Sequence, residues 1–198
     1  FSNKRILISG GAGYIGSHVS LALKSTNATV AILDNLSTGF ESNIQFGTLH
    51  QLDLDDHHAV TQFITEFQPD AVIHFAGSIV VPESVKIPLK YYQNNTANSL
   101  HLIQTCLNQN IQHFLFSSTA AVYGIPKSGT CSETDSLHPI NPYGRSKLMT
   151  EQMLQDTAAI SHLNYVALRY FNGIFKTTLT SLKMIKYLYK LKKKLKKN

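Results

Sequence analysis

The chain has 198 residues, 43% of them hydrophobic and 15% charged, which is typical of one globular domain and excludes a disordered or low-complexity protein. Its formal net charge of +6 arises at one end, because every acidic residue precedes Lys176 while half of the 18 Lys and Arg residues follow Phe175. The excess positive charge therefore belongs to a C-terminal tail, and it indicates no specific nucleic-acid partner for the rest of the chain.

Short apolar runs alternate along the chain with longer segments of helical periodicity. The runs predict six strands: Arg5–Ser9, Thr29–Asp34, Thr48–Leu52, Ala71–Phe75, His113–Ser117 and Tyr165–Tyr170. The longer segments predict helices at Tyr14–Ser25, Asp56–Phe67, Pro88–Asn108 and Pro142–Ile160. Because the strands hardly alternate between polar and apolar residues, we expect them to be buried on both faces of a parallel sheet. The pattern predicts an α/β fold, a Rossmann-like doubly wound parallel sheet with helices on both faces.

A glycine-rich stretch, Gly-Gly-Ala-Gly-Tyr-Ile-Gly at 10–16, lies between the first strand and the first helix. Glycine permits a tight turn there and lets a pyrophosphate approach the helix N-terminus, where the frame of Gly10, Gly13 and Gly16 is satisfied. A tight turn alone would also explain the glycines. Asp34, however, closes the second strand, where its carboxylate can accept both hydroxyls of an adenosine ribose and would repel a 2′-phosphate. The stretch therefore predicts a dinucleotide site that prefers NAD over NADP.

Two residues of the fourth predicted helix, Tyr143 and Lys147, are spaced i, i+4 and so lie on one helical face. A tyrosine is a poor base at neutral pH, and lowering its pKa by about 3 units requires about 4 kcal/mol of preferential phenolate stabilisation. The lysine ammonium and a positive nicotinamide ring could together supply it. An exposed helix pair is the alternative. Residues 117–119, Ser-Ser-Thr, place hydroxyls at the carboxyl edge of the sheet, where doubly wound folds bind ligands.

With these motifs in place, the chain resembles the extended short-chain dehydrogenase/reductase superfamily and, within it, the UDP-glucose 4-epimerase family. The resemblance covers residues 5–172 and rests on stretches that occur in order: GGAGYIGSH (10–18), LDNLSTG (33–39), Asp53-Leu54, HFAG (74–77), PESV (82–85), PLKYYQNN (88–95), FSSTAAVYG (116–124), NPYGRSKLMTEQ (141–152) and LRYFN (168–172).

The resemblance implies a role for each matching position. Tyr143 would be the catalytic acid/base, with Lys147 lowering its pKa and holding the nicotinamide ribose, and Thr119 would bridge to the sugar hydroxyl. Asn172 would begin the contacts with a UDP-sugar substrate. Further contacts with NAD would come from Gly10, Gly13, Tyr14, Ile15, Gly16, Asp34, Asn35, Asp53, Leu54, Phe75, Ala76, Gly77, Asn94 and Phe171. The implied reaction interconverts UDP-glucose and UDP-galactose through a transient 4-keto sugar, with no net oxidation. A homodimer could form through helices 88–108 and 142–160.

Two features of the sequence differ from those of other enzymes of the same superfamily. Related sugar dehydratases place an acidic pair directly after the threonine of the fifth strand, whereas Ala120 and Ala121 stand here and cannot move protons. Some relatives also have a lysine in the loop after HFAG, which residues 78–81 lack. The 4-epimerase reading is favoured. The alternatives are another nucleotide-sugar enzyme of the superfamily and a non-catalytic NAD-binding fragment with a basic tail.

The sequence shows no pattern typical of a secreted, membrane or metal-binding protein. Cys106 and Cys131 form neither a disulfide framework nor a zinc motif and suit a reducing, cytoplasmic compartment. The nine histidines show no metal-ligand spacing, so we expect no metal site. No apolar run approaches the roughly 20 residues that span a bilayer, and residues 1–5 lead directly into a strand, so we expect no membrane span and no signal peptide.

We divide the chain into a Rossmann-like NAD-binding domain, residues 1–172, and an atypical Lys-rich tail, residues 173–198. The resemblance implies a smaller C-terminal domain after LRYFN that holds the uridine nucleotide, and the tail has none of its pattern. We therefore expect the C-terminal substrate domain to be missing, through a frameshift or premature truncation near residue 173, and little or no epimerase activity. The alternatives are a frayed tail or a basic helix with apolar residues at helical spacing: Leu182, Ile185, Leu188, Leu191 and Leu195.

Overall fold

A computed structural model describes residues 3–126 and 129–171. Its core is one six-stranded sheet in which every neighbouring pair of strands is parallel, in the order β3-β2-β1-β4-β5-β6. The strands are β1 (Arg5–Ser9), β2 (Thr29–Asp34), β3 (Thr48–Gln51), β4 (Ala71–His74), β5 (His113–Ser117) and β6 (Asn164–Leu168). This order confirms the predicted doubly wound, Rossmann-like fold.

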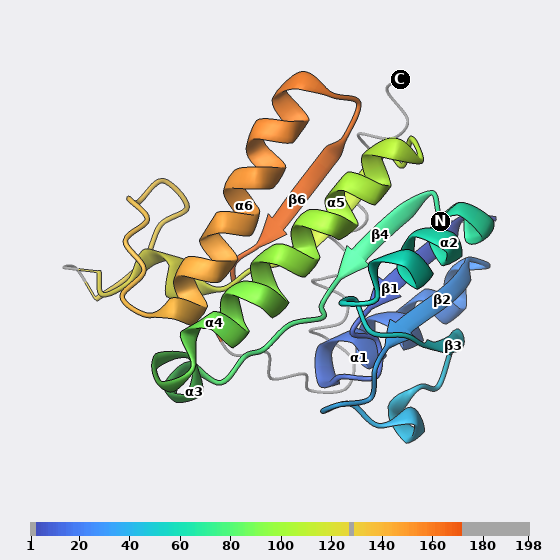
Figure 1. Ribbon diagram of the computed structural model, residues 1–198, viewed down its shortest axis with the longest axis horizontal. Coiled ribbons are helices and arrows are strands. Elements are labelled where there is room, and N and C mark those ends of the chain that lie inside the picture. Colours follow the sequence, from blue (N-terminus) through green and yellow to red (C-terminus); the bar gives the residue numbers. More distant parts are fainter. Residues whose placement is uncertain (1–2, 127–128, 172–198) are drawn as a thin grey trace.

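Helices cover both faces of the sheet, but unequally within the part of the chain that is described. On one face lie α2 (His57–Phe67), α5 (Asn98–Asn108) and α6 (Pro142–Ile160), and Figure 1 shows them in front of the strands. On the other face α1 (Tyr14–Leu23) packs against β1 and β2. Successive residues of a strand point to opposite faces, so Leu7 joins the first core and its neighbour Ile8 the second. Both faces are apolar, which explains the near-continuous hydrophobic runs.

The predicted helix 88–108 is interrupted. It consists of α4 (Pro88–Tyr91), a π-helical segment η3 (Tyr92–Ala97) and α5. Within the π-helical segment the Asn95 carbonyl accepts hydrogen bonds from two side chains, Ser99 Oγ at 2.6 Å and Thr150 Oγ1 at 2.9 Å. Side-chain hydroxyls that compete for a helix carbonyl distort the helix locally, and single π-turns occur often at functional sites. Helical periodicity did not predict this interruption.

Smaller differences concern the ends of elements. The strand predicted to Phe75 ends at His74, because the backbone N–H groups of Phe75 and Ala76 both donate to the Ser9 carbonyl, at 2.8 and 3.1 Å, and turn the chain out of the ladder. The third strand ends at Gln51, the sixth runs over Asn164–Leu168, and α1 gives way to a 3₁₀ turn at Lys24–Thr26. One short helix, α3 (Val81–Lys86), was not predicted.

Two groups of expectations lie outside the described residues: the substrate contact of Asn172, and the nature of the tail at 173–198. Within the described ranges, no helix is both long and apolar enough to pass through a bilayer.

Candidate active site

The candidate site lies at the carboxyl edge of the sheet, next to the junction of β1 and β4. The chain moves outward from β1 to β2 and β3 and then returns to β4 on the other side, so the loops after β1 and β4 diverge there. Doubly wound folds bind their ligands in the crevice at such a switch point. Residues 10–16 follow β1 and residues 75–78 follow β4, so the topology brings two predicted cofactor segments together.

The glycines of the loop after β1 serve different purposes. Gly10 has a φ of +72°, and a Cβ there would lie 2.5 Å from the Ala76 nitrogen. At Gly16 a Cβ would lie 2.7 Å from the Gly11 Cα. Packing within the chain thus demands glycine at both positions. At Gly13 a Cβ would meet only the Gly10 carbonyl oxygen, at 3.3 Å, so this position leaves an open approach to the start of α1.

The N-terminus of α1 suits an anion. Its N-cap is Gly13, and no side chain caps the helix by a hydrogen bond. The first N–H groups of a helix have no partner within it, and they carry the positive end of the helix dipole. A loop whose backbone can be approached closely, directed at those N–H groups, fits the pyrophosphate of a dinucleotide.

The predicted adenosine residues lie together beside this loop. The Asp34 carboxylate accepts the backbone N–H groups of Ala12 and Leu36, each at 2.9 Å, and so fixes the phosphate loop to the end of β2. Asn35 Nδ2 donates to Asp53 Oδ2 at 2.8 Å, which joins the ends of β2 and β3. Residues 33–39 contain no Lys or Arg that could pair with a 2′-phosphate. The donor and acceptor set therefore fits NAD better than NADP.

Lys147 is buried at the centre of the site. Its side chain is 2% exposed, and its Nζ donates to the Ser117 carbonyl at 3.1 Å and lies 5.0 Å from the centre of the Phe116 ring. Burial lowers its pKa to about 8. Gly77, with a φ of +151°, passes so close that a Cβ there would lie 3.3 Å from this Nζ. The same Cβ would lie still closer to Asn95 Oδ1, at 2.8 Å, so Asn95 and Lys147 together require the glycine of the HFAG motif.

Tyr143 faces the same place from the start of α6. Asn141 caps this helix by accepting the Gly144 N–H at 2.8 Å, which fixes the first turn. Burial raises the pKa of Tyr143, while a hydrogen bond from the Thr119 side chain opposes that effect. Thr119 Oγ1 also accepts the Ala121 N–H at 3.1 Å, so its single proton is left for the tyrosine oxygen. Without a further cation, the phenol remains protonated at neutral pH.

Known proteins share this arrangement of motifs. A model of the NAD dependent epimerase/dehydratase family matches residues 6–190. The chain belongs to this family. A UDP-glucose 4-epimerase of Azospirillum brasilense is 51% identical over 172 residues, which are 86% of this chain and 49% of the relative. One from Rhizobium meliloti (strain 1021) is 43% identical over 171 residues, 86% of this chain and 52% of the relative. The chain therefore spans about half the length of the curated relatives it matches.

Solved structures agree with the fold. The crystal structure of UDP-glucose 4-epimerase from Brucella ovis in complex with NAD has a TM-score of 0.82 and 43% identity, over 85% of this chain and 52% of that one. The UDP-Glc/GlcNAc 4-epimerase from Campylobacter jejuni has a TM-score of 0.83 and 45% identity, over 89% of this chain and 57% of that one. The resemblance predicted from the sequence motifs is confirmed.

In this epimerase/dehydratase chain, Asn95 organises the loop around Lys147, a role the sequence did not predict. Asn95 is 1% exposed, and its Oδ1 accepts the Ser78 N–H at 2.7 Å. Its Nδ2 donates to the Ser78 carbonyl at 3.0 Å and to Ser146 Oγ at 3.1 Å. The predicted residue Asn94 donates to Ser78 Oγ at 2.9 Å. The doubled Asn of the YYQNN stretch was the signal, and only its first member was assigned a role.

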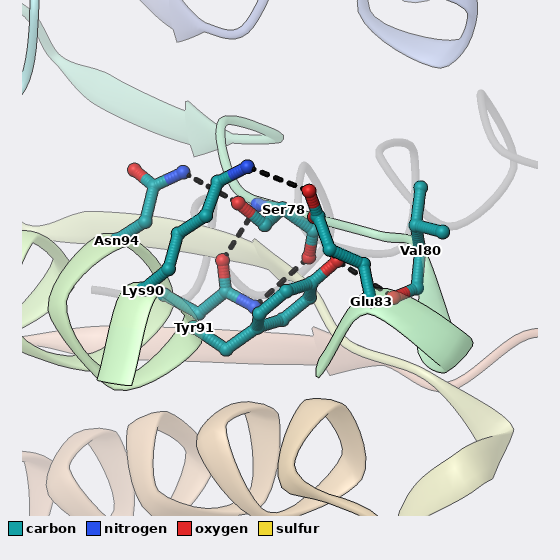
Figure 2. A network of polar contacts seen from close by, with 7 residues as sticks. Ser78, Val80, Glu83, Lys90, Tyr91 and Asn94 are labelled. Carbon is teal, nitrogen blue, oxygen red and sulfur yellow. Dashed lines mark hydrogen bonds and ion pairs between the residues drawn. The ribbon is translucent and has the colours of Figure 1, made fainter. Parts of the chain in front are cut away.

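A second unpredicted network holds the other end of the same loop (Figure 2). The Tyr91 hydroxyl lies 2.7 Å from the Val80 carbonyl oxygen and 2.7 Å from a Glu83 carboxylate oxygen, and Lys90 pairs with Glu83 at 2.9 Å. The Tyr91 ring is fully buried and meets the Tyr143 ring edge-on, with 6.4 Å between their centres. The unpredicted helix α3 therefore connects to the candidate acid/base through Tyr91.

A partly buried ion pair between Arg169 and Glu151 stabilises the β6 side of the site. Arg169, just after β6, binds the Glu151 carboxylate through two nitrogens, with Nη2 to Oε2 at 2.6 Å and Nε to Oε2 at 3.0 Å. Glu151 also accepts the Ser118 hydroxyl, and Arg169 Nη1 donates to the Tyr123 hydroxyl at 2.9 Å. These bonds fix the segment that carries Thr119. The predicted cofactor residue Phe171 is 75% exposed.

Proposed function

We propose that this chain binds NAD and supplies the acid/base machinery of a UDP-glucose 4-epimerase. The observation that carries the proposal is the meeting of a buried Lys147, the Thr119–Tyr143 hydrogen bond and the open glycine loop at one sheet edge. A buried ammonium with a single carbonyl acceptor costs stability, and Tyr143, a half-buried phenol with a raised pKa, lies on the same helix. Ionisable groups with such shifted pKa values concentrate at functional sites. The assigned roles of Tyr143, Lys147 and Thr119 are part of this proposal.

The side chains of the site account for proton transfer at the C4 hydroxyl of a sugar. Tyr143 must be a phenolate before it can take the hydroxyl proton, and Lys147 stabilises that phenolate. Thr119, which donates to the tyrosine oxygen, favours the same charged form. NAD, when bound, supplies the hydride acceptor and later the hydride donor. Return of the proton by Tyr143 restores the hydroxyl, so the protein ends the cycle as it began.

The proposed cofactor contacts are those that the family resemblance implies. Residues of the glycine loop would hold the pyrophosphate, Asp34 and Asn35 the adenosine ribose, and Asp53 and Leu54 the adenine. Residues 75–77, Asn94, Phe171 and Lys147 would hold the nicotinamide half. The Brucella ovis relative, solved in complex with NAD, supports this choice of cofactor.

A UDP-sugar is the proposed substrate class. Structures of UDP-glucose 4-epimerases from Thermotoga maritima with UDP-glucose, and from Stenotrophomonas maltophila with NAD and formylated UDP-arabinopyranose, support it. The alanines at 120 and 121 support epimerisation over dehydration, because neither can donate or accept a proton.

The experiment measures two properties of the 198-residue chain, with Tyr143→Phe as the matched variant. Calorimetric titration with NAD and with NADP tests the cofactor site, where we expect NAD to bind and NADP to bind at least tenfold more weakly. Conversion of UDP-galactose to UDP-glucose tests the chemistry, and any turnover should vanish in Tyr143→Phe while NAD affinity persists. NAD binding without conversion would limit the proposal to cofactor binding, and no NAD binding would refute it.

We also propose that two copies associate through the helices at 88–108 and 142–160. Leu100 on α5 is 52% exposed and Met149 on α6 is 41% exposed, so each helix offers an apolar side chain to a partner. Sedimentation velocity would show a dimer that Leu100→Glu dissociates. A monomer at all concentrations would refute this association.

A further inference from the structure

His74, the last residue of β4, is fully buried and uses both ring nitrogens. Nδ1 lies 2.6 Å from Ser9 Oγ, and Nε2 lies 2.8 Å from Ser99 Oγ. The ring packs against Phe114 and Phe116 of β5, with ring centres 5.9 and 5.7 Å away. It therefore connects β1 to α5 through the centre of the molecule.

The direction of these hydrogen bonds follows from counting protons. Ser99 Oγ donates its single proton to the Asn95 carbonyl at 2.6 Å, so it can only accept from His74. Nε2 must then carry the hydrogen, and Nδ1, with its lone pair, accepts the hydroxyl proton of Ser9. Burial and the nearby charge of Lys147 lower the pKa of His74 to about 3, which keeps the ring neutral and this tautomer intact.

The series of hydrogen bonds from Ser9 through His74 and Ser99 to Asn95 reaches a part of the candidate site at each end. Ser9 immediately precedes Gly10, and its carbonyl accepts the N–H groups of Phe75 and Ala76. At the other end the Asn95 carbonyl also accepts Thr150 Oγ1 of α6, at 2.9 Å, while the Asn95 side chain holds Ser78. The bonds thus run in one direction from β1 through β4 and α5 to the π-helical segment.

We propose that His74 is a positioning residue, whose directional hydrogen bonds set the glycine loop after β1 relative to the segment that carries Asn94 and Asn95. This inference rests on the proposed NAD site, because one part would hold the pyrophosphate and the other the nicotinamide half of the same dinucleotide. A histidine that only fills the core would affect stability. A positioning histidine also affects cofactor affinity, because the two halves of the site must keep their separation.

The test uses Ser99→Ala, which removes the oxygen that accepts from His74 and donates to Asn95 and so breaks two of the three hydrogen bonds, and compares it with Ser20→Ala. Ser20 is a matched control, because it is as fully buried as Ser99 and its hydroxyl donates to the Phe46 carbonyl, which takes no part in this series of hydrogen bonds. We expect both variants to lose stability. Only Ser99→Ala should weaken NAD binding, by about tenfold.

Nitrogen NMR of the imidazole rings gives an independent readout, with the His74 signals assigned from their loss in His74→Phe. We expect Nε2 protonated and Nδ1 unprotonated at pH 6. The opposite tautomer, a charged ring at that pH, or wild-type NAD affinity in folded Ser99→Ala would overturn the inference. Failure of the wild type to bind NAD would instead refute the proposed function, and the tautomer would still decide whether the hydrogen bonds run from Ser9 to Asn95.

Discussion

Replacing Lys147 with methionine should make the protein more stable and, at the same time, a poorer binder of NAD. The substitution keeps an unbranched side chain of similar length but removes the ammonium, which is 2% exposed and accepted by one carbonyl, that of Ser117. A buried cation with so few partners is costly to the folded state. If the lysine is retained for function, its removal should relieve that cost.

The magnitude follows from the pKa. The fall from 10.5 to about 8 corresponds to about 3 kcal/mol of destabilisation wherever the amine is charged in both states. Between pH 8 and 10.5 the folded protein releases the proton while the unfolded chain keeps it, so the free energy of unfolding rises with pH through that window. Loss of the hydrogen bond to Ser117 offsets about 1–2 kcal/mol, which leaves Lys147→Met about 1–2 kcal/mol more stable than the wild type at pH 7.

Urea unfolding at pH 7 and at pH 10 would measure the difference, beside calorimetric titration with NAD. The stability advantage of Lys147→Met should shrink or reverse at pH 10, where the wild-type amine is largely neutral. NAD affinity should fall by about tenfold or more, because a charged hydrogen-bond donor is lost. A variant less stable than the wild type at pH 7 by over about 1 kcal/mol would refute the reasoning, since it would make Lys147 a structural residue.

Three further predictions concern the surroundings of this lysine. Gly13→Ala should cost under about 1 kcal/mol of stability yet weaken NAD binding at least tenfold, whereas Gly16→Ala, whose Cβ would lie 2.7 Å from a backbone carbon, should be clearly destabilised. Calorimetric titration with NAD and urea unfolding would distinguish the two variants. Equal effects on binding and on stability would contradict the different roles of the two glycines. Arg169→Met should cost about 3–5 kcal/mol because it leaves the Glu151 carboxylate buried and unpaired, and a thermal shift no larger than that of a surface variant would disprove this. Asp34→Asn should weaken NAD binding about tenfold and improve NADP relative to NAD, and an unchanged preference in competitive titration would remove Asp34 from the ribose site.

Much of the fold could be read from local patterns. Strands buried on both faces leave continuous apolar runs, and six such runs separated by helical segments were sufficient for the parallel sheet. The glycine frame at 10–16 and the pair Tyr143 and Lys147 are equally local, because their meaning depends on spacings of three or four residues. The errors have a different cause, because the ends of elements depend on long-range bonds such as those from Phe75 and Ala76 to Ser9.

What the sequence alone determined is therefore which residues we propose for the chemistry: the glycine frame, Asp34, and a tyrosine with a lysine one turn away. What only the tertiary structure decided is the state of those residues. The parallel sheet brings Gly77 and Ser117 onto Lys147, and thereby sets its burial and lowers its pKa. It likewise brings Asn95 against Ser78. These contacts join residues 17 to 70 positions apart, and no periodic pattern encodes them, because they arise where separate strand–helix crossovers meet at one sheet edge.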